Sequence, residues 1–122
     1  MAKPLEGVRV LDLTRVLAGP FCTMMLSDLG AEIIKVEVPG TGDDSRAFGP
    51  FRNEQSLYFV NVNRGKKSIA IDLKTNGGKK LLKELAAVSD VIVENFRPGT
   101  MEKLGLGWDV LKEVNPRLIY AA

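Results

Sequence analysis

Stretches with the two-residue period of a β-strand alternate with stretches of helical period, and this alternation restricts the possible folds more than any other feature. The predicted strands cover residues 8–13, 32–36, 68–73, 90–95 and 118–122. The predicted helices cover residues 20–29, 75–88, 100–104 and 108–114. Strands that alternate with helices at this spacing are typical of βαβ units. We therefore expect an α/β fold with an open, Rossmann-like parallel sheet and right-handed crossovers.

Two segments carry more specific expectations. In the first helix, apolar residues recur at helical spacing and end before Gly30, which predicts that this face packs into the core. The lone Cys22 belongs to that face and is expected to be a core residue. Residues 56–62 are apolar but short, and periodicity does not separate helix from strand there. The residues of the apolar helix face are Ala18, Phe21, Cys22, Met25, Leu26 and Leu29.

Charge and residue types exclude several classes of function. The chain has 122 residues, with 17 Lys and Arg against 15 Asp and Glu, so a net charge of +2 does not favour nucleic acid or a membrane as partner. It has no histidine and one cysteine, which excludes Ser-His-Asp catalysis, an intrachain disulfide and the usual zinc sites within these residues. We expect no metal site, and any chemistry must use carboxylates, lysines, arginines and backbone amides.

The candidate binding site is the edge where the predicted parallel strands end, because ligands of such sheets bind outside the carboxyl ends of the strands. Polar residues stand at these ends, in residues 14–15, 36–38, 72–74 and 95–97. Two glycine-containing segments, 40–44 and 65–68, do not satisfy the dinucleotide fingerprint or the P-loop pattern. A nicotinamide dinucleotide site is therefore not expected.

Two groups at this edge leave alternatives open. The basic residues Arg64, Lys66, Lys67 and Lys74 form either a solvated strand entry or, through Lys74 at a strand end, a phosphate site. Phe96 beside Asn95 either stacks on a ligand ring or packs in the core beside a capped turn. The residues alone do not decide either case.

Taken together, five stretches of the chain resemble the family III CoA-transferases, the group that includes formyl-CoA transferase, carnitine CoA-transferase and succinyl-CoA:glutarate CoA-transferase. They span nearly the whole chain in one order, so the resemblance is specific although each piece alone is weak. The stretches are PLEGVRVLDLTRVLAGPFCTMMLSDLGAEIIKVE, GTGDDSR, SLYFVNVNRGKKSIAIDLK, SDVIVENFRPGTMEKLGLG and NPRLIYA.

The resemblance implies a coenzyme A site at the strand ends, with basic groups on the phosphates and backbone guiding the nucleotide and pantetheine. Two departures matter: Val38 stands where relatives often have arginine, and Leu17 replaces a glutamine of the formyl-CoA enzyme. No catalytic residue is assigned, since the family's nucleophilic aspartate lies downstream of the residues matched here. The expected CoA contacts are Arg15, Leu17, Ala18, Ile71, Asp72, Leu73, Lys74, Asn95, Phe96, Arg97 and Lys103.

The resemblance further implies that residues 1–122 are the N-terminal CoA-binding segment of a longer enzyme, which moves CoA from an acyl-CoA to a carboxylic acid through an aspartyl intermediate. The segment alone is expected to be inactive. CoA and acyl-CoA are substrates, with no prosthetic group, and the complete chain is expected to be an interlocked homodimer in the cytoplasm or the mitochondrial matrix. Two alternatives remain: a racemase-like isomerase of α-methylacyl-CoA, and a non-catalytic CoA-binding module.

Overall fold

A five-stranded parallel sheet organises the protein. In the computed structural model, which covers residues 1–122, the strands lie in the order β5-β2-β1-β6-β7, and every neighbouring pair is parallel. This is the strand order of doubly wound α/β sheets, so the predicted fold class is confirmed. The strands are β1 (Arg9–Asp12), β2 (Glu32–Glu37), β5 (Lys67–Ala70), β6 (Val91–Val93) and β7 (Ile119–Ala121).

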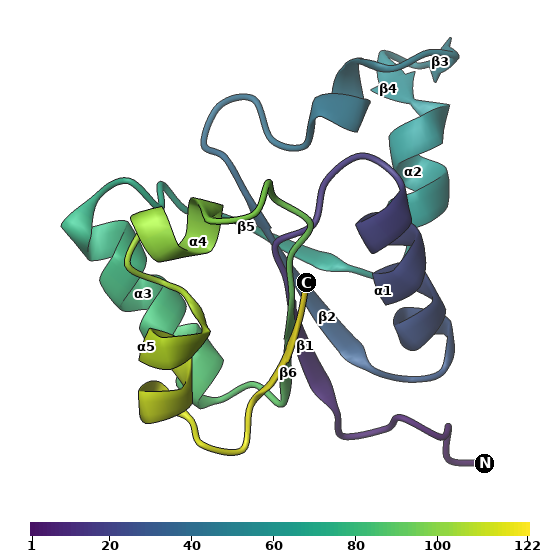
Figure 1. Ribbon diagram of the computed structural model, residues 1–122. Coiled ribbons are helices and arrows are strands. Elements are labelled where there is room, and N and C mark those ends of the chain that lie inside the picture. The colour runs from purple at the N-terminus through teal and green to yellow at the C-terminus, as the bar shows by residue number, and fades with distance from the viewer.

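Helices cover both faces of the sheet (Figure 1). On one face lie α1 (Ala18–Asp28) and α2 (Leu57–Asn63). On the other lie α3 (Asn76–Ala87), α4 (Thr100–Lys103) and α5 (Trp108–Val114). None of these helices is long and apolar enough to cross a lipid bilayer.

The connection from β2 to β5 contains structure that the sequence did not predict. A 3-10 helix, η1 (Asp44–Ala47), precedes an antiparallel hairpin of β3 (Phe51–Arg52) and β4 (Gln55–Ser56). The ambiguous residues 56–62 are mostly helix, because the Ser56 hydroxyl accepts the Phe59 N–H at 3.1 Å and caps α2. The hairpin and α2 stand beside α1 at one end of the molecule (Figure 1).

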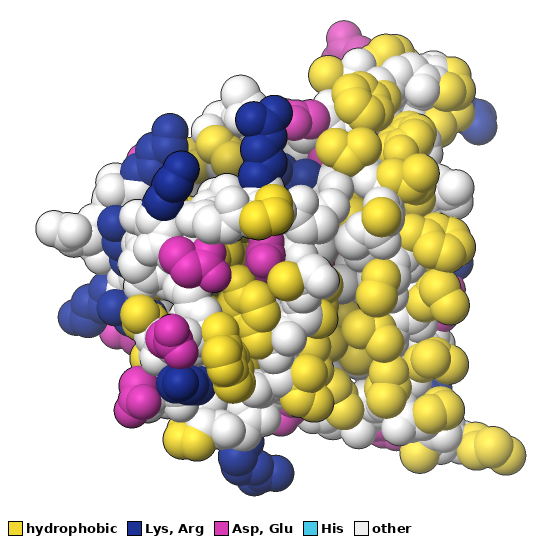
Figure 2. All heavy atoms as spheres, viewed as in Figure 1, with side chains coloured by type: hydrophobic (Ala, Val, Ile, Leu, Met, Phe, Trp, Pro, Cys, Tyr) yellow, Lys and Arg dark blue, Asp and Glu magenta, His cyan; other side chains and the backbone are white.

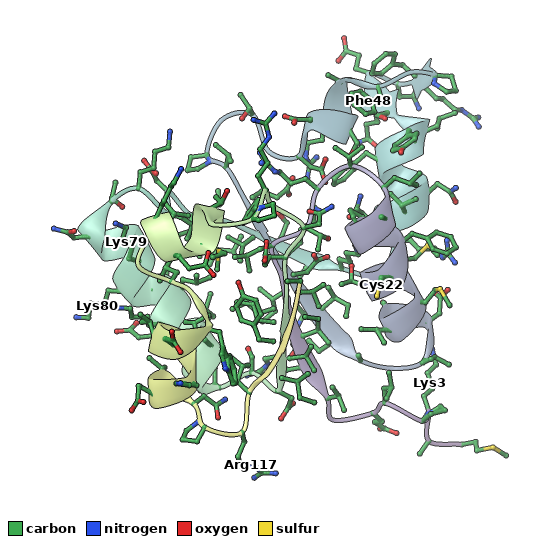
Figure 3. The ribbon with its side chains drawn as sticks, in the orientation of Figure 1. Lys3, Cys22, Phe48, Lys79, Lys80 and Arg117 are labelled. Carbon is green, nitrogen blue, oxygen red and sulfur yellow. The ribbon has the colours of Figure 1, made fainter.

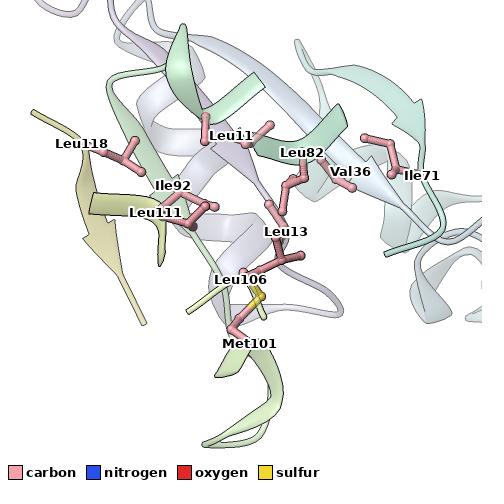
Figure 4. Close-up of a cluster of buried hydrophobic side chains, with 11 residues drawn as sticks. Leu11, Leu13, Val36, Ile71, Leu82, Ile92, Met101, Leu106, Leu111 and Leu118 are labelled. Carbon is pink, nitrogen blue, oxygen red and sulfur yellow. The ribbon is translucent and has the colours of Figure 1, made fainter. Parts of the chain in front are cut away.

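The main hydrophobic core lies between the sheet and the α3–α5 layer. Leu11 and Leu13 of the first strand region meet Leu82 of α3 and Ile92 of β6, and all four are at most 1% exposed (Figure 4). The α1 side has a smaller core of Val10, Ala31, Ile33 and Val93. The remaining members of the main core are Val36, Ile71, Ala86, Met101, Leu106, Leu111 and Leu118.

The expectation that the apolar face of α1 packs into the core is wrong for most of the face, although Leu26 does pack against the smaller core. Phe21, Met25 and Leu29 are 45–49% exposed, and Cys22 is an exposed free thiol, not a core residue. Figure 3 shows Cys22 on α1, and Figure 2 shows hydrophobic side chains gathered over this helix. The helix buries its opposite face instead, through Gly19, Pro20, Thr23 and Met24. A polar interaction explains this orientation of α1. The Asp12 carboxylate on the sheet faces the helix, and the Thr23 hydroxyl donates to it at 2.6 Å.

Candidate functional site

A cavity of about 360 Å³ opens at the carboxyl edge of the sheet. Its walls come from the ends of β1, β2 and β5, from the loop after β2, and from the segment between β6 and α4. This volume is within the range of small-molecule sites, and the location is where doubly wound sheets bind ligands. The lining residues are Leu13, Thr14, Arg15, Lys35, Val36, Glu37, Val38, Gly42, Asp43, Ile71, Asp72, Leu73, Lys74, Phe96, Thr100 and Leu104.

The cavity brings together about half of the residues that the sequence singled out. Arg15, Phe96 and the four residues from Ile71 to Lys74 line it. Five others do not: Leu17, Ala18, Asn95, Arg97 and Lys103. All five are exposed, and Lys103 lies on α4 between Thr100 and Leu104, which do line the cavity.

The sequence assigned no role to three charged residues of the lining, although Glu37 lies within the predicted strand end 36–38. Lys35 and Glu37 come from β2, and Asp43 comes from the loop that follows it. A signal was present, because Lys35 and Glu37 occupy alternate positions of a strand that is apolar from Ile33 to Val36 apart from Lys35, and they therefore share one face. Charged residues are rarely buried unless they are paired, so two charged residues on one face of a central strand indicate a buried ion pair.

Lys35 and Asp43 form that buried pair. The ammonium lies 2.9 Å from the carboxylate, and the side chains are 2% and 0% exposed. Burial by itself would raise the pKa of Asp43, but the Ser45 N–H and the Lys35 ammonium outweigh it, so the pKa is lowered. The carboxylate therefore stays charged and occupied by its partners.

Glu37 is held in a second charged cluster at the mouth of the cavity. Arg46 contacts it with two nitrogens, at 2.7 and 2.8 Å, and Ser68 and the Asp43 N–H also donate to it. Burial acts to raise the pKa of Glu37, yet these hydrogen bonds lower it to about 2. The Arg46 guanidinium also stacks on Phe59, 3.9 Å from the ring centre, and so ties this loop to α2.

The basic cluster around the third predicted strand separates into different roles. Lys66 is buried and contacts Asp12 at 3.0 Å, while Arg64 pairs with Asp28. Lys67 pairs with Glu32 on the surface. Of the four basic residues, Lys74 alone lines the cavity. The surface interpretation thus holds for Arg64 and Lys67, whereas the phosphate interpretation of Lys74 stays a prediction.

Arg15 and Phe96 form the cationic and aromatic part of the cavity wall. The Arg15 guanidinium carbon lies 5.1 Å from the centre of the Phe96 ring, within cation–π range. Phe96 also packs against the main core, as one of the two interpretations predicted, and stacking on a ligand ring stays a prediction. A cation, a ring face and the nearby Lys74 together suit a ligand that has phosphates and an extended organic part.

The fold and the cavity define an α/β protein with a cavity, lined in part by Arg15 and Lys74, at the carboxyl edge of its parallel sheet. Sequence comparison identifies it more closely: the model of CoA-transferase family III matches residues 5–122, and the chain belongs to that family. It is 59% identical over 121 residues to succinyl-CoA:glutarate CoA-transferase of Mus musculus, covering 98% of this chain and 28% of that protein. It is 53% identical over 119 residues to acetyl-CoA:oxalate CoA-transferase of Acetobacter aceti, covering 98% and 31%.

Solved structures agree with the family assignment. The crystal structure of Rv3272 from Mycobacterium tuberculosis superposes with a TM-score of 0.90 at 53% identity, covering 98% of this chain and 32% of that one. A CAIB/BAIF family protein from Brucella suis gives a TM-score of 0.91 at 45% identity, covering 98% and 33%. The chain thus spans about a third or less of the length of the relatives that it matches.

Proposed function

We propose that this chain forms the CoA-binding part of an enzyme that transfers coenzyme A between an acyl-CoA thioester and a carboxylic acid. The observation that carries the proposal is the cavity at the carboxyl edge of the sheet, lined by Arg15, Lys74 and Phe96, in a member of CoA-transferase family III. Relatives named for such transfers use different acids, glutarate in one and oxalate in another. The acid that this protein uses is therefore stated only as a small carboxylic acid.

Within the cavity, the two cations have distinct proposed roles. Lys74 lies just beyond β5 and contacts a phosphate, while Arg15 and Phe96 bind the nucleotide end of CoA. Ile71 and Leu73 supply apolar wall beside the pantetheine, and Asp72 fixes the turn, because it accepts the Lys74 N–H at 2.9 Å. Five expected CoA contacts lie outside the cavity lining. We assign them to the surface around the cavity, over which a ligand longer than the cavity would extend. They are Leu17, Ala18, Asn95, Arg97 and Lys103.

Replacing Lys74 with alanine is expected to weaken CoA binding about fivefold, or about 1 kcal/mol, because one exposed cation leaves the phosphate site. Isothermal calorimetry with CoA measures the change. Lys80→Ala is the matched control, since Lys80 is an exposed lysine on α3 that points outward (Figure 3) and does not line the cavity. Equal CoA affinity of the two variants would show that Lys74 is a solvated surface residue and does not contact CoA.

The covalent step is assigned to a residue outside this chain. We propose an aspartate nucleophile that lies downstream, which attacks the thioester carbonyl and releases the CoA thiolate, giving a mixed anhydride. The thiolate then attacks the aspartyl carbonyl of the anhydride and releases the first acid, leaving an aspartyl-CoA thioester. The acceptor carboxylate attacks that thioester and expels the thiolate, which gives a second anhydride. The thiolate attacks the acceptor acyl carbonyl of this anhydride, forming the new acyl-CoA and freeing the aspartate. The cavity carboxylates Asp43 and Glu37 are unsuited to this step, because both are bound to cations and N–H donors.

The exposed apolar face supports a further part of the proposal, that the complete protein is a homodimer. Phe21, Met25, Leu57 and Val60 of α1 and α2 are 42–49% exposed, and hydrophobic side chains dominate this side of the molecule in Figure 2. Contiguous apolar surface of this kind marks an interface with protein. Sedimentation of the full-length protein measures the assembly state.

The free thiol of Cys22 accords with a reducing compartment, for which we propose the cytoplasm or the mitochondrial matrix.

A graft tests the proposed activity. The chain replaces the corresponding 121 residues of the Mus musculus succinyl-CoA:glutarate CoA-transferase, to which it is 59% identical. The graft is expected to exchange CoA between succinyl-CoA and glutarate within about one order of magnitude of the parent enzyme. A folded graft that epimerises a 2-methylacyl-CoA without exchange would favour the isomerase alternative. One that binds CoA but does neither would favour the non-catalytic module.

A further inference from the structure

The loop between β1 and α1 has a strained backbone at the wall of the cavity. Val16 lies in the left-handed region, with φ of 73°. A β-branched residue is rarely found there, and the conformation costs about 1–2 kcal/mol. Such strain persists only where the surroundings enforce it, and it concentrates at functional sites. The groups that enforce it here can be identified.

The buried Lys35–Asp43 pair holds the amide of the strained residue and the carbonyl of Thr14, two residues before it. The Val16 N–H donates to the two Asp43 carboxylate oxygens at 3.1 and 3.3 Å. The Lys35 ammonium donates to the Thr14 carbonyl at 2.9 Å and contacts Asp43 at the same distance. The pair thus joins the β1–α1 loop to β2 and to the loop that follows β2.

Asn95 holds the residue between them. Its side-chain oxygen accepts the Arg15 N–H at 2.9 Å, and its side-chain nitrogen donates to the Arg15 carbonyl at 2.9 Å. Both hydrogen-bonding functions of the Asn95 amide are therefore engaged by one backbone unit. Since Asn95 follows β6, three separate parts of the sheet edge clamp residues 14–16.

The consequence falls on the cavity wall. Arg15 lies within the clamped segment, and its guanidinium sits over Phe96. The clamp also fixes the direction in which the chain enters α1, which begins two residues after Val16. A loop free to leave the left-handed conformation would move both Arg15 and the start of α1.

We propose that Asp43, Lys35 and Asn95 are positioning residues, which hold the β1–α1 loop in its strained conformation and thereby preorganise Arg15 for binding CoA. The proposal rests on the proposed CoA site. In this proposal the side-chain amide of Asn95 binds the Arg15 backbone and does not contact CoA directly. Preorganisation of this kind raises affinity, because the ordering of the loop is complete before the ligand arrives.

A double-mutant cycle tests the clamp. Asp43→Asn is expected to weaken CoA binding about tenfold, because the strained loop relaxes away from the binding geometry. Glycine adopts a positive φ without strain, so in a Val16→Gly background the same Asp43→Asn change is expected to cost only about threefold. Asp44→Asn, at the exposed neighbouring carboxylate, is the matched control and leaves the affinity unchanged. Equal losses in the two backgrounds would show that Asp43 acts only on stability, and would overturn the proposal.

A second measurement needs no ligand and uses a variant at an exposed position. A residue with positive φ has a short distance between its own amide and α protons, which gives a strong NMR cross-peak. Val16 is expected to show this cross-peak in the unmutated chain and in Asp44→Asn, and to lose most of it in Asn95→Ala. If Asn95→Ala leaves the cross-peak unchanged, there is no clamp. Failure of the unmutated chain to bind CoA would contradict the proposed site instead, while the cross-peak would still judge the clamp.

Discussion

Replacing Lys66 with methionine is expected to destabilise the fold by about 3–5 kcal/mol, because it leaves the buried carboxylate of Asp12 without its cation. The Lys66 and Asp12 side chains are 2% and 0% exposed, and the ammonium also donates to the Pro20 carbonyl and the Asn63 side chain. Burial lowers the pKa of Lys66, and the Asp12 charge opposes this shift. Urea denaturation followed by circular dichroism measures the loss.

The adjacent lysine gives a matched control for that prediction. Lys67 is 72% exposed and pairs with Glu32 on the surface, so Lys67→Met is expected to leave the urea midpoint almost unchanged. If Lys66→Met does not fold, the double variant Asp12→Asn with Lys66→Met keeps the test open, because it removes both charges and should regain most of the stability. A Lys66→Met midpoint equal to that of Lys67→Met would contradict the assigned role of the buried pair.

Gly78→Ala is expected to destabilise the protein by about 2–4 kcal/mol, because the new methyl group has no space. A Cβ at this position would lie 1.9 Å from the Asp72 carbonyl oxygen. That carbonyl also accepts the Thr75 N–H and hydroxyl at the start of α3, so the helix cannot move away without losing these bonds. The displaced residues, Asp72 to Lys74, line the cavity, and CoA affinity should fall together with stability.

The same substitution at the neighbouring Gly77 is expected to have the opposite effect on stability. No atom lies within 4 Å of a Cβ built on Gly77, and the residue is helical. Gly77→Ala should therefore stabilise α3 by up to about 1 kcal/mol. Thermal unfolding of the two variants gives the comparison. Equal melting temperatures would show that the close approach of α3 to the end of β5 does not constrain the chain.

The sequence predicted the architecture well, because the alternation of strand and helix periods is local and extends along the whole chain. The residues of α5, Trp108–Val114, match the predicted bounds, and α3 begins after the predicted Thr75 cap. The β3–β4 hairpin escaped prediction because each of its strands has two residues, too few for a period to appear.

The orientation of α1 could not be read from its own residues. Its apolar residues recur at helical spacing, yet Phe21, Met25 and Leu29 face outward. What decides the orientation is Asp12 on the neighbouring strand, which draws Thr23 and Lys66 towards the sheet. Periodicity identifies an apolar face but does not say whether the sheet or another surface covers it.

Some residues of the candidate site were predicted from the sequence, and others were not. Residues at strand ends, such as Arg15 and Lys74, were found because topology brings the carboxyl ends of parallel strands together. The partnership of Lys35 with Asp43 was not found, because it joins a strand to a loop eight residues later through side chains alone. The same holds for Asn95, whose contact with Arg15 spans 80 residues of sequence.

Calorimetric titration of the folded chain with CoA tests the central claim most directly. We expect saturable binding of one CoA per chain, with amide NMR shifts concentrated on Arg15, on the turn from Asp72 to Lys74, and on Phe96 at the carboxyl edge of the sheet. A folded chain that gives no binding heat, or whose shifts lie away from that edge, would contradict it.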